Sequence, residues 1–184
     1  MLKVKRLGFL SSHVFLLIGA ILSLLIMGVM NFWLIPSIVS QAPDMKVFDL
    51  CFTGYNPEYA KSFIDAIGSV GKQIYLTRQL PLDFLFLFVY SSFYFALTLK
   101  LGGKVGSFLK IMIFLLFISD FFENILVYSL IKNNNYSHAL VSKASFFTQT
   151  KSVFLFMVLG VFFLCFAYKT INAFLRKLNS VKGT

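Results

Sequence analysis

The sequence predicts an all-α, polytopic membrane protein, in which four transmembrane helices form one bundle and a short amphipathic helix lies in the first loop outside the membrane. Hydrophobic residues make up 58% of its 184 residues and charged residues only 13%, whereas a soluble domain is about half apolar and about a quarter charged. A chain of this composition cannot cover its apolar surface in water, and it is too apolar to remain disordered. Its apolar residues gather in four long continuous stretches, none of which alternates as the strands of a membrane barrel do.

The first predicted span covers about residues 9–35, and Trp33 and Pro36 mark its far end. Its length exceeds the roughly 20 apolar residues that cross a bilayer. A cleaved signal peptide is the alternative, because three basic residues precede the stretch: Lys3, Lys5 and Arg6. The apolar part is about twice as long as a signal-peptide core, and no Ala-x-Ala cleavage site follows it, so we expect a retained helix.

A long loop, residues 36–79, follows the first span and contains the start signals of a helix over about residues 57–67. Asn56 can cap the first turn, Pro57 suits the first helical position, and Glu58 suits the positive end of the helix dipole. The apolar residues of this segment share one face: Tyr59, Phe63, Ile64 and Ile67. We therefore expect a short amphipathic helix that either lies on the membrane surface or caps the bundle.

Three further apolar stretches complete the predicted bundle: residues 80–99, 110–131 and 146–168, each with approximate bounds. Pro81 stands at the start of the second span, where a proline is well tolerated. The glycines of residues 100–110 predict a tight turn between the second and third spans. The sequence contains neither an internal repeat nor a segment with the composition of a soluble domain, so residues 1–184 are predicted to form one transmembrane domain.

The net charge of +10 predicts the orientation in the membrane rather than nucleic-acid binding. Ten Lys and Arg residues, with no Asp or Glu among them, lie in three segments on the side of both termini: residues 3–6, 100–110 and 169–182. The other seven basic residues are balanced by all seven acids. Because positive residues stay on the cytoplasmic side, we expect both termini in the cytoplasm, with the protein in the inner membrane of a bacterium. The basic segments also suit anionic headgroups, and membrane lipids are the expected partners.

The sequence predicts no cofactor and no metal site. Cys51 falls in the first loop and Cys165 near the opposite end of the fourth span, so the two cannot form a disulfide in this topology. The redox chemistry of vitamin K epoxide reductases is therefore excluded, because no Cys-x-x-Cys motif is present either. The sequence also contains no cluster of Cys and His suited to a metal and no Gly-x-Ser-x-Gly nucleophile motif.

Ionisable residues inside the spans are the best indication of a functional site. Each costs about 3 kcal/mol near the bilayer centre, so such residues usually face the protein interior and find partners there. Asp120, Glu123 and Asn124 of the third span are spaced i, i+3 and i+4 and therefore share one helical face. The fourth span contains Lys151, a cation that could face these acids.

The depths of the charged residues predict that they meet. At 1.5 Å per residue, Glu123 lies about 12 Å, Lys151 about 8 Å and Asp83 about 5 Å below the outer ends of their spans. Arg78 stands just outside the second span, and Asp120 lies deeper, near the midplane. Uncharged polar residues could complete a network in the outer half of the bundle: Tyr75, Asn124, Thr148 and Gln149.

Two interpretations of this cluster remain open. In the structural one, Lys151 pairs with Glu123 or Asp120, Arg78 pairs with Asp83, and the ion pairs fix the packing of the helices. In the functional one, the cluster is an outward-opening polar pocket in which Asp120 and Glu123 act as acid and base. The predicted cluster contains three acids and two bases: Asp83, Asp120 and Glu123 against Arg78 and Lys151. This excess leaves one carboxyl without a counter-charge and able to exchange a proton.

A pattern of residues spread over about residues 48–168 resembles a known group of proteins. The residues stand in this order: Gly54-Tyr55, Gly68, Gly71-Lys72, Tyr75, Pro81-x-Asp83, Tyr90, Asp120-x-x-Glu123-Asn124 and Thr150-Lys151. In this pattern the chain resembles a family of small four-span bacterial membrane proteins without an assigned activity. The resemblance implies a four-helix membrane fold and no particular chemistry. A looser likeness to the emopamil-binding, sterol isomerase type of four-span protein, which also places carboxylates between helices, carries over no individual residue.

Three functions are therefore considered. A lipid-interacting or accessory membrane component would tolerate Glu123→Gln when it is paired with Lys151→Met. A small lipid-modifying enzyme with isomerase-like acid/base chemistry would lose turnover in Asp120→Asn or Glu123→Gln while the fold survives. A proton- or ion-coupled transporter would show flux that depends on the same residues. Four spans without an inverted repeat argue against transport, although a homodimer would supply a second half; another membrane protein is the alternative partner.

Overall fold

The computed structural model describes residues 12–134 and 136–182, and the described chain is helical throughout, with short loops and no strand. Four of its helices are long and apolar enough to cross a membrane, which confirms the predicted all-α, multi-pass class. In chain order the elements are α2 (His13–Val29), η1 (Met30–Leu34), α3 (Ile35–Ile38), η2 (Val39–Gln41), η3 (Phe48–Leu50), α4 (Pro57–Ala66), α5 (Gly68–Ile74), η4 (Tyr75–Gln79), α6 (Leu80–Leu101), α7 (Gly103–Asn133) and α8 (His138–Lys182).

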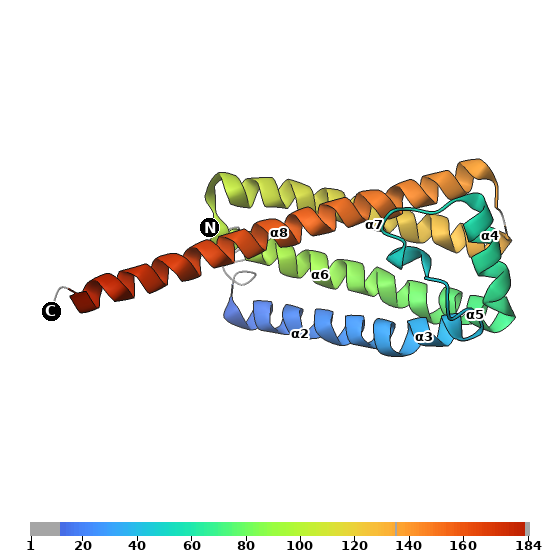
Figure 1. Ribbon diagram of the computed structural model, residues 1–184, viewed down its shortest axis with the longest axis horizontal. Helices are drawn as coiled ribbons and strands as arrows, with labels where there is room; N and C mark the ends of the chain where they lie inside the picture. The colour runs from blue at the N-terminus through green and yellow to red at the C-terminus, as the bar shows by residue number, and fades with distance from the viewer. Residues whose placement is uncertain (1–11, 135, 183–184) are drawn as a thin grey trace, which may run out of the picture.

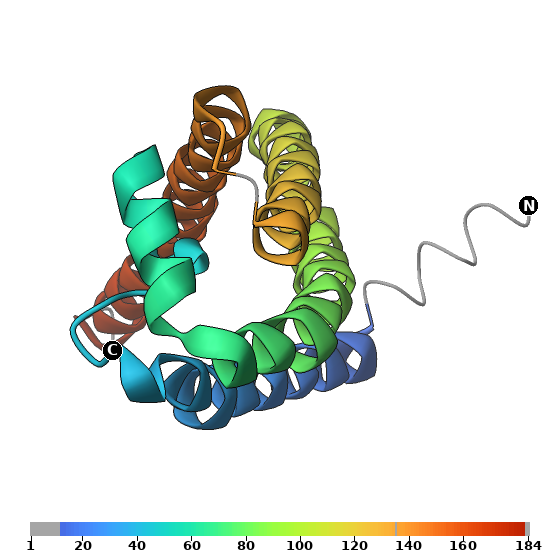
Figure 2. The same cartoon turned by 90° about the vertical axis from the view of Figure 1, so that its right-hand side faces the viewer.

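The long helices run side by side, and each packs against its neighbour in the chain: α2 against α6, α6 against α7, and α7 against α8 (Figure 1). Seen from one end they form an arc with α2 and α8 at its two ends (Figure 2). The short helices η3 and α4 lie together at that end of the bundle. We call this end the loop face; α2 begins and α8 ends on the opposite side.

The first two spans are longer than the sequence predicted. Helix continues without a break over residues 13–41 and again over residues 68–101, so much of the predicted loop 36–79 is helical. Each of these two spans contains one π-turn, and a proline stands two residues after each turn: Pro36 after η1 and Pro81 after η4. A proline ring lacks a donor and clashes with the carbonyl four residues earlier. The wider π-turn removes that conflict, so the helix passes the proline instead of ending there.

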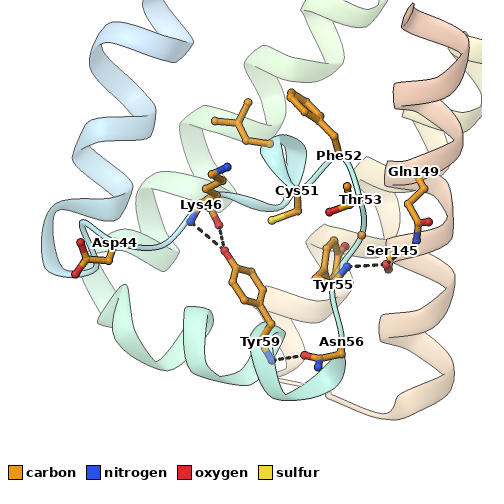
Figure 3. A pocket seen from close by; sticks show the side chains of 12 residues that line it. Asp44, Lys46, Cys51, Phe52, Thr53, Tyr55, Asn56, Tyr59, Ser145 and Gln149 are labelled. Carbon is orange, nitrogen blue, oxygen red and sulfur yellow. Dashed lines mark hydrogen bonds between the residues drawn. The ribbon is translucent and has the colours of Figure 1, made fainter.

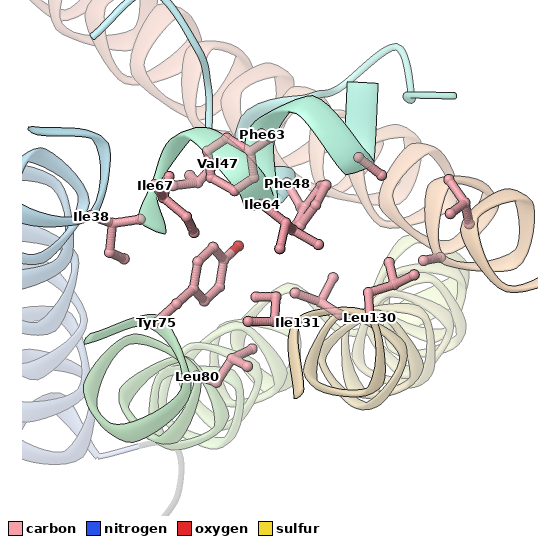
Figure 4. Close-up of a cluster of buried hydrophobic side chains, with 14 of the residues drawn as sticks. Ile38, Val47, Phe48, Phe63, Ile64, Ile67, Tyr75, Leu80, Leu130 and Ile131 are labelled. Atoms are coloured by element: carbon pink, nitrogen blue, oxygen red, sulfur yellow. The ribbon is translucent and has the colours of Figure 1, made fainter. Parts of the chain in front are cut away.

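The helix predicted over residues 57–67 is present as α4, and it caps the bundle. The side chain of Asn56 accepts a hydrogen bond of 2.8 Å from the backbone N–H of Tyr59, as the N-cap prediction requires. The apolar face of α4 is buried in a core beneath the loop face, between α5, α7 and η3 (Figure 4). Ten side chains of this core are labelled there: Ile38, Val47, Phe48, Phe63, Ile64, Ile67, Tyr75, Leu80, Leu130 and Ile131. Gly68, with φ of 60°, lets the chain turn from α4 into α5.

The last two spans also exceed their predicted bounds. The turn between α6 and α7 uses Gly102 and Gly103, both at positive φ, which agrees with the tight turn expected there. Helix α8 runs well past the ends of its neighbours on the side opposite the loop face (Figure 1). The predicted start of the first span and the basic residues before it, Lys3, Lys5 and Arg6, lie outside the described residues.

Candidate functional site

The ammonium group of Lys151 on α8 is the centre of a buried charged cluster beneath the loop face. Its Nζ lies 2.5 Å from Glu123 Oε2, 3.2 Å from Asp120 Oδ1 and 3.3 Å from Asp49 Oδ1. The side chains of Lys151 and Asp49 are each 12% exposed, whereas Glu123 is fully buried. These are the ion pairs that the structure contains within its described part, and all of them share this one lysine.

Hydroxyl groups on the neighbouring helices complete the contacts of the two α7 carboxylates. Thr148, one turn before Lys151 on α8, donates a hydrogen bond of 2.7 Å to Glu123 Oε1. Tyr90 on α6 donates one of 2.6 Å to Asp120 Oδ2. Because Asp120 and Glu123 are three residues apart, both point from α7 toward this site. The structure therefore brings together Asp120, Glu123, Thr148 and Lys151, as the helical spacing predicted.

Asp49 belongs to the cluster, although the sequence analysis assigned it only to the loop. The short helix η3 carries it below the loop face, where its second oxygen accepts a hydrogen bond of 3.0 Å from the hydroxyl of Tyr75. Tyr75 is fully buried, as its predicted place in the network requires. The signal for Asp49 was its position within the apolar run Val47-Phe48-Asp49-Leu50, which is unusual for a solvated loop acid. Tyr90, also missed as a site residue, offered no comparable signal.

A second group of buried polar side chains lies between α6 and α7. Asp83 is only 5% exposed and faces both Asn124 and Asp120, but it makes no ion pair with any described residue. Gln79, one turn before it, is fully buried as well. The cluster thus contains four carboxyl groups and one ammonium group. It is electrically neutral only when three of the four carboxyls carry a proton.

The structure does not bring Arg78 into the cluster, so the predicted pair between Arg78 and Asp83 is wrong. Arg78 is exposed on the outside of the bundle, next to Val70 and Thr77. The reason is the continuous helix from η4 into α6: residues five apart leave a helix in different directions, so only one of these two can face the interior. Gln79 occupies the buried position instead.

An open pocket of about 760 Å³ lies on the loop face between the segment before α4 and the first turns of α8 (Figure 3). Its lining is Asp44, Lys46, Leu50, Cys51, Phe52, Thr53, Gly54, Tyr55, Asn56, Tyr59, Ser145 and Gln149. The backbone N–H of Tyr55 donates a hydrogen bond of 2.8 Å to Ser145 Oγ. Gly54, at φ of 88°, lies so close to α8 that a Cβ there would stand 2.3 Å from Gln149 Nε2. This contact fixes the position of the loop against the helix.

The pocket has a polar interior and an apolar rim. Phe52 packs edge-on against Phe156 of α8 at 5.8 Å between ring centroids, and these rings are 47% and 57% exposed. On the other side of the pocket, the hydroxyl of Tyr59 both donates to and accepts from the backbone of Lys46, at 2.8 and 2.9 Å. Burial raises the pKa of Tyr59 to about 12, so this hydroxyl stays protonated and keeps the donor role.

The charged cluster lies directly beneath this pocket. Asp49 precedes two residues that line it, Leu50 and Cys51. Burial raises the pKa of the Cys51 thiol, and the negative charges of Asp49 and Glu123 raise it further. Burial is also the main cause that raises the pKa of Tyr55, and the charge of Glu123 is the second cause. Members of the cluster are therefore close neighbours of two residues that line the pocket, Cys51 and Tyr55.

Within the described residues, no three His, Cys, Asp or Glu side chains gather in a way that could hold a metal ion. The arrangement can instead accept hydrogen bonds, hold protons on its surplus carboxyls and attract a cationic group.

Comparison with protein-family models, with curated proteins and with solved structures finds no match to this chain. The resemblance to the four-span bacterial family accordingly stays a prediction.

Proposed function

We propose that this is a lipid-interacting membrane protein that holds the headgroup of a membrane amphiphile in the loop-face pocket. The observation that carries the proposal is the joining of a polar pocket to the exposed aromatic rings of Phe52 and Phe156. An amphiphile needs such a pair of surfaces, because its headgroup requires hydrogen-bonding partners while its chains require an apolar one. Ser145 and Gln149, one turn apart on α8, offer polar groups on the pocket wall.

In this proposal the charged cluster positions the pocket. Lys151 on α8 holds Asp49 of the loop, and Tyr75 holds the same carboxylate from the other side. Removing one member of a buried ion pair leaves an uncompensated charge, which is strongly destabilising. The cluster thereby keeps the loop seated over the bundle, and the pocket keeps its shape.

A photoactivatable phospholipid with a diazirine near its headgroup tests the proposal in reconstituted bilayers. We expect crosslinks, mapped by mass spectrometry, on the pocket lining and on Phe156. Thr53→Trp, at an exposed position of the lining, should fill the pocket and remove most of these crosslinks. Thr170→Trp, at an exposed position near the far end of α8, is the matched control and should leave them unchanged. Crosslinks spread evenly along the spans in all three proteins would refute the proposal.

A lipid-modifying enzyme is the second candidate, because one lining residue of the pocket approaches the cluster. The hydroxyl of Tyr55 is buried without a hydrogen-bond partner among the described residues and lies near Thr148, which donates to Glu123. Acid/base chemistry at Asp120 or Glu123 would change a total lipid extract incubated with the protein, and mass spectrometry would detect the product. Asp120→Asn and Glu123→Gln should abolish that change while the protein stays folded; an unchanged extract with the unmodified protein would eliminate this candidate.

Proton- or ion-coupled transport has less support. Beyond Asp120 and Tyr90 the described core contains an apolar cluster of Leu109, Ile113 and Val158, which interrupts a polar path toward the other face. We propose that both termini lie in the cytoplasm, on the basis of the Lys and Arg distribution, and that the membrane is a bacterial inner membrane, on the basis of the resemblance to four-span bacterial proteins. A C-terminal fusion to alkaline phosphatase should be inactive and a fusion to green fluorescent protein should fluoresce; the opposite pair of results would reverse the orientation.

A further inference from the structure

The charge beneath the pocket is unbalanced, and this imbalance bears on the headgroup that the pocket can take. Lys151 is shared by three carboxylates, and Asp83 adds a fourth without an ion pair among the described residues. Unless three of these groups are protonated, the cluster is negative. Its charged side chains are largely buried, so water and salt screen its field only weakly.

The pocket itself contains one carboxylate and one ammonium among its lining residues, Asp44 and Lys46. Their other lining neighbours are uncharged, with hydroxyl and amide groups from Thr53, Ser145 and Gln149. A headgroup with one positive and one negative group matches this arrangement. Its cationic part would lie at Asp44, and its anionic part would lie at Lys46 (Figure 3).

We propose that the loop-face pocket selects amphiphiles whose headgroup carries a cationic amine together with a phosphate, as a phosphoethanolamine headgroup does. This inference rests on the proposed lipid-binding function and names the class of ligand. The carboxylate of Asp49, which directly precedes the lining residues Leu50 and Cys51, adds negative charge next to the pocket and favours a headgroup with an amine. The same charge disfavours an anionic headgroup, which has no cation to place there.

The test compares two lipids that differ only in the charge of the nitrogen. Phosphatidylethanolamine and its N-acetyl derivative have the same chains and the same phosphate, but acetylation removes the positive charge. The full-length protein in detergent micelles is supplied with an equal mixture of both, and native mass spectrometry measures which lipid remains bound. We expect a preference of about threefold to tenfold for the free amine, the range of one partly exposed, charge-assisted contact.

Two aspartate variants assign the preference to the pocket. Asp44→Asn removes the carboxylate of the lining and should lower the preference, whereas Asp65→Asn, on an exposed position of α4 outside the pocket, should leave it unchanged. Equal retention of both lipids, or a preference that Asp44→Asn does not alter, would overturn this inference. If retention of either lipid equals that of Thr53→Trp, no lipid occupies the pocket, and the proposed function itself fails.

Discussion

Replacing Lys151 by methionine removes the single ammonium group that three carboxylates share. Its Nζ lies within 3.3 Å of an oxygen of each of Asp49, Asp120 and Glu123, and its side chain is 12% exposed. Deleting one partner of such a buried pair costs about 3–5 kcal/mol, because the remaining charges lose their compensation. Methionine has a similar length and adapts its shape, so little of this cost would come from an empty cavity. We therefore expect the free energy of unfolding to fall by about 3–5 kcal/mol.

A second substitution separates the charge effect from a packing effect. Glu123→Gln removes one of the unpaired carboxylates and keeps an oxygen that can accept from Thr148. The variant with Lys151→Met and Glu123→Gln together should therefore be more stable than Lys151→Met alone. Its loss should be smaller than the sum of the two single losses by about 1–3 kcal/mol, the coupling energy of the pair. A loss caused by packing alone would not be recovered in this way.

The assay is unfolding by sodium dodecyl sulfate in mixed micelles, followed through the fluorescence of Trp33, the one tryptophan of the chain. Lys143→Met is the matched control, because Lys143 is exposed on the same helix, and its effect should stay within about 0.5 kcal/mol. A Lys151→Met protein within about 1 kcal/mol of the unmodified one, or a double variant less stable than the single one, would refute the account of the cluster as a charge-compensated anchor.

Three further predictions concern the loop over the bundle. Gly54→Ala should destabilise the protein by at least about 1–2 kcal/mol, since residue 54 has φ of 88° and lies against α8. Gly160→Ala changes a helical position with open space around it and should be neutral or stabilising in the same unfolding assay. Equal losses in both variants would contradict this prediction. Asn56→Ala should cost about 1 kcal/mol by removing the N-cap of α4; faster amide hydrogen exchange confined to α4 is the expected sign, and unchanged exchange there would rule the cap out. Burial raises the pKa of the Cys51 thiol, so a smaller fraction of it should be thiolate at pH 8 than in an ordinary cysteine. In a Cys165→Ser background it should therefore react slowly with iodoacetamide, and the rate should still rise above pH 9. Tyr59→Phe removes a neighbouring hydroxyl that lowers this pKa and should slow the reaction further. A rate equal to that of a free thiol would contradict the burial.

Features that depend on neighbouring residues along one helix were predictable from the sequence. Four apolar stretches of sufficient length predicted four spans, and the structure has four. Asn56 and Pro57 predicted the start of α4, because capping is a local interaction. The spacing of Asp120 and Glu123 placed both on one face of α7, because 3.6 residues per turn fix that direction wherever the helix lies.

Contacts between residues of different elements could be identified only from the packed bundle. Asp49 reaches Lys151 because the loop folds back below the surface, and no local pattern specifies the path of a loop. Arg78 points outward because the π-turn η4 joins α5 and α6 into one helix. The packing of this whole span sets the direction of the Arg78 side chain, whereas its nearness to Asp83 in the sequence does not. The choice between a surface helix and a cap was settled in the same way, by the burial of the apolar face of α4 against α5, α7 and η3. Local geometry is encoded over a few residues, whereas contacts between elements depend on the packing of the entire bundle.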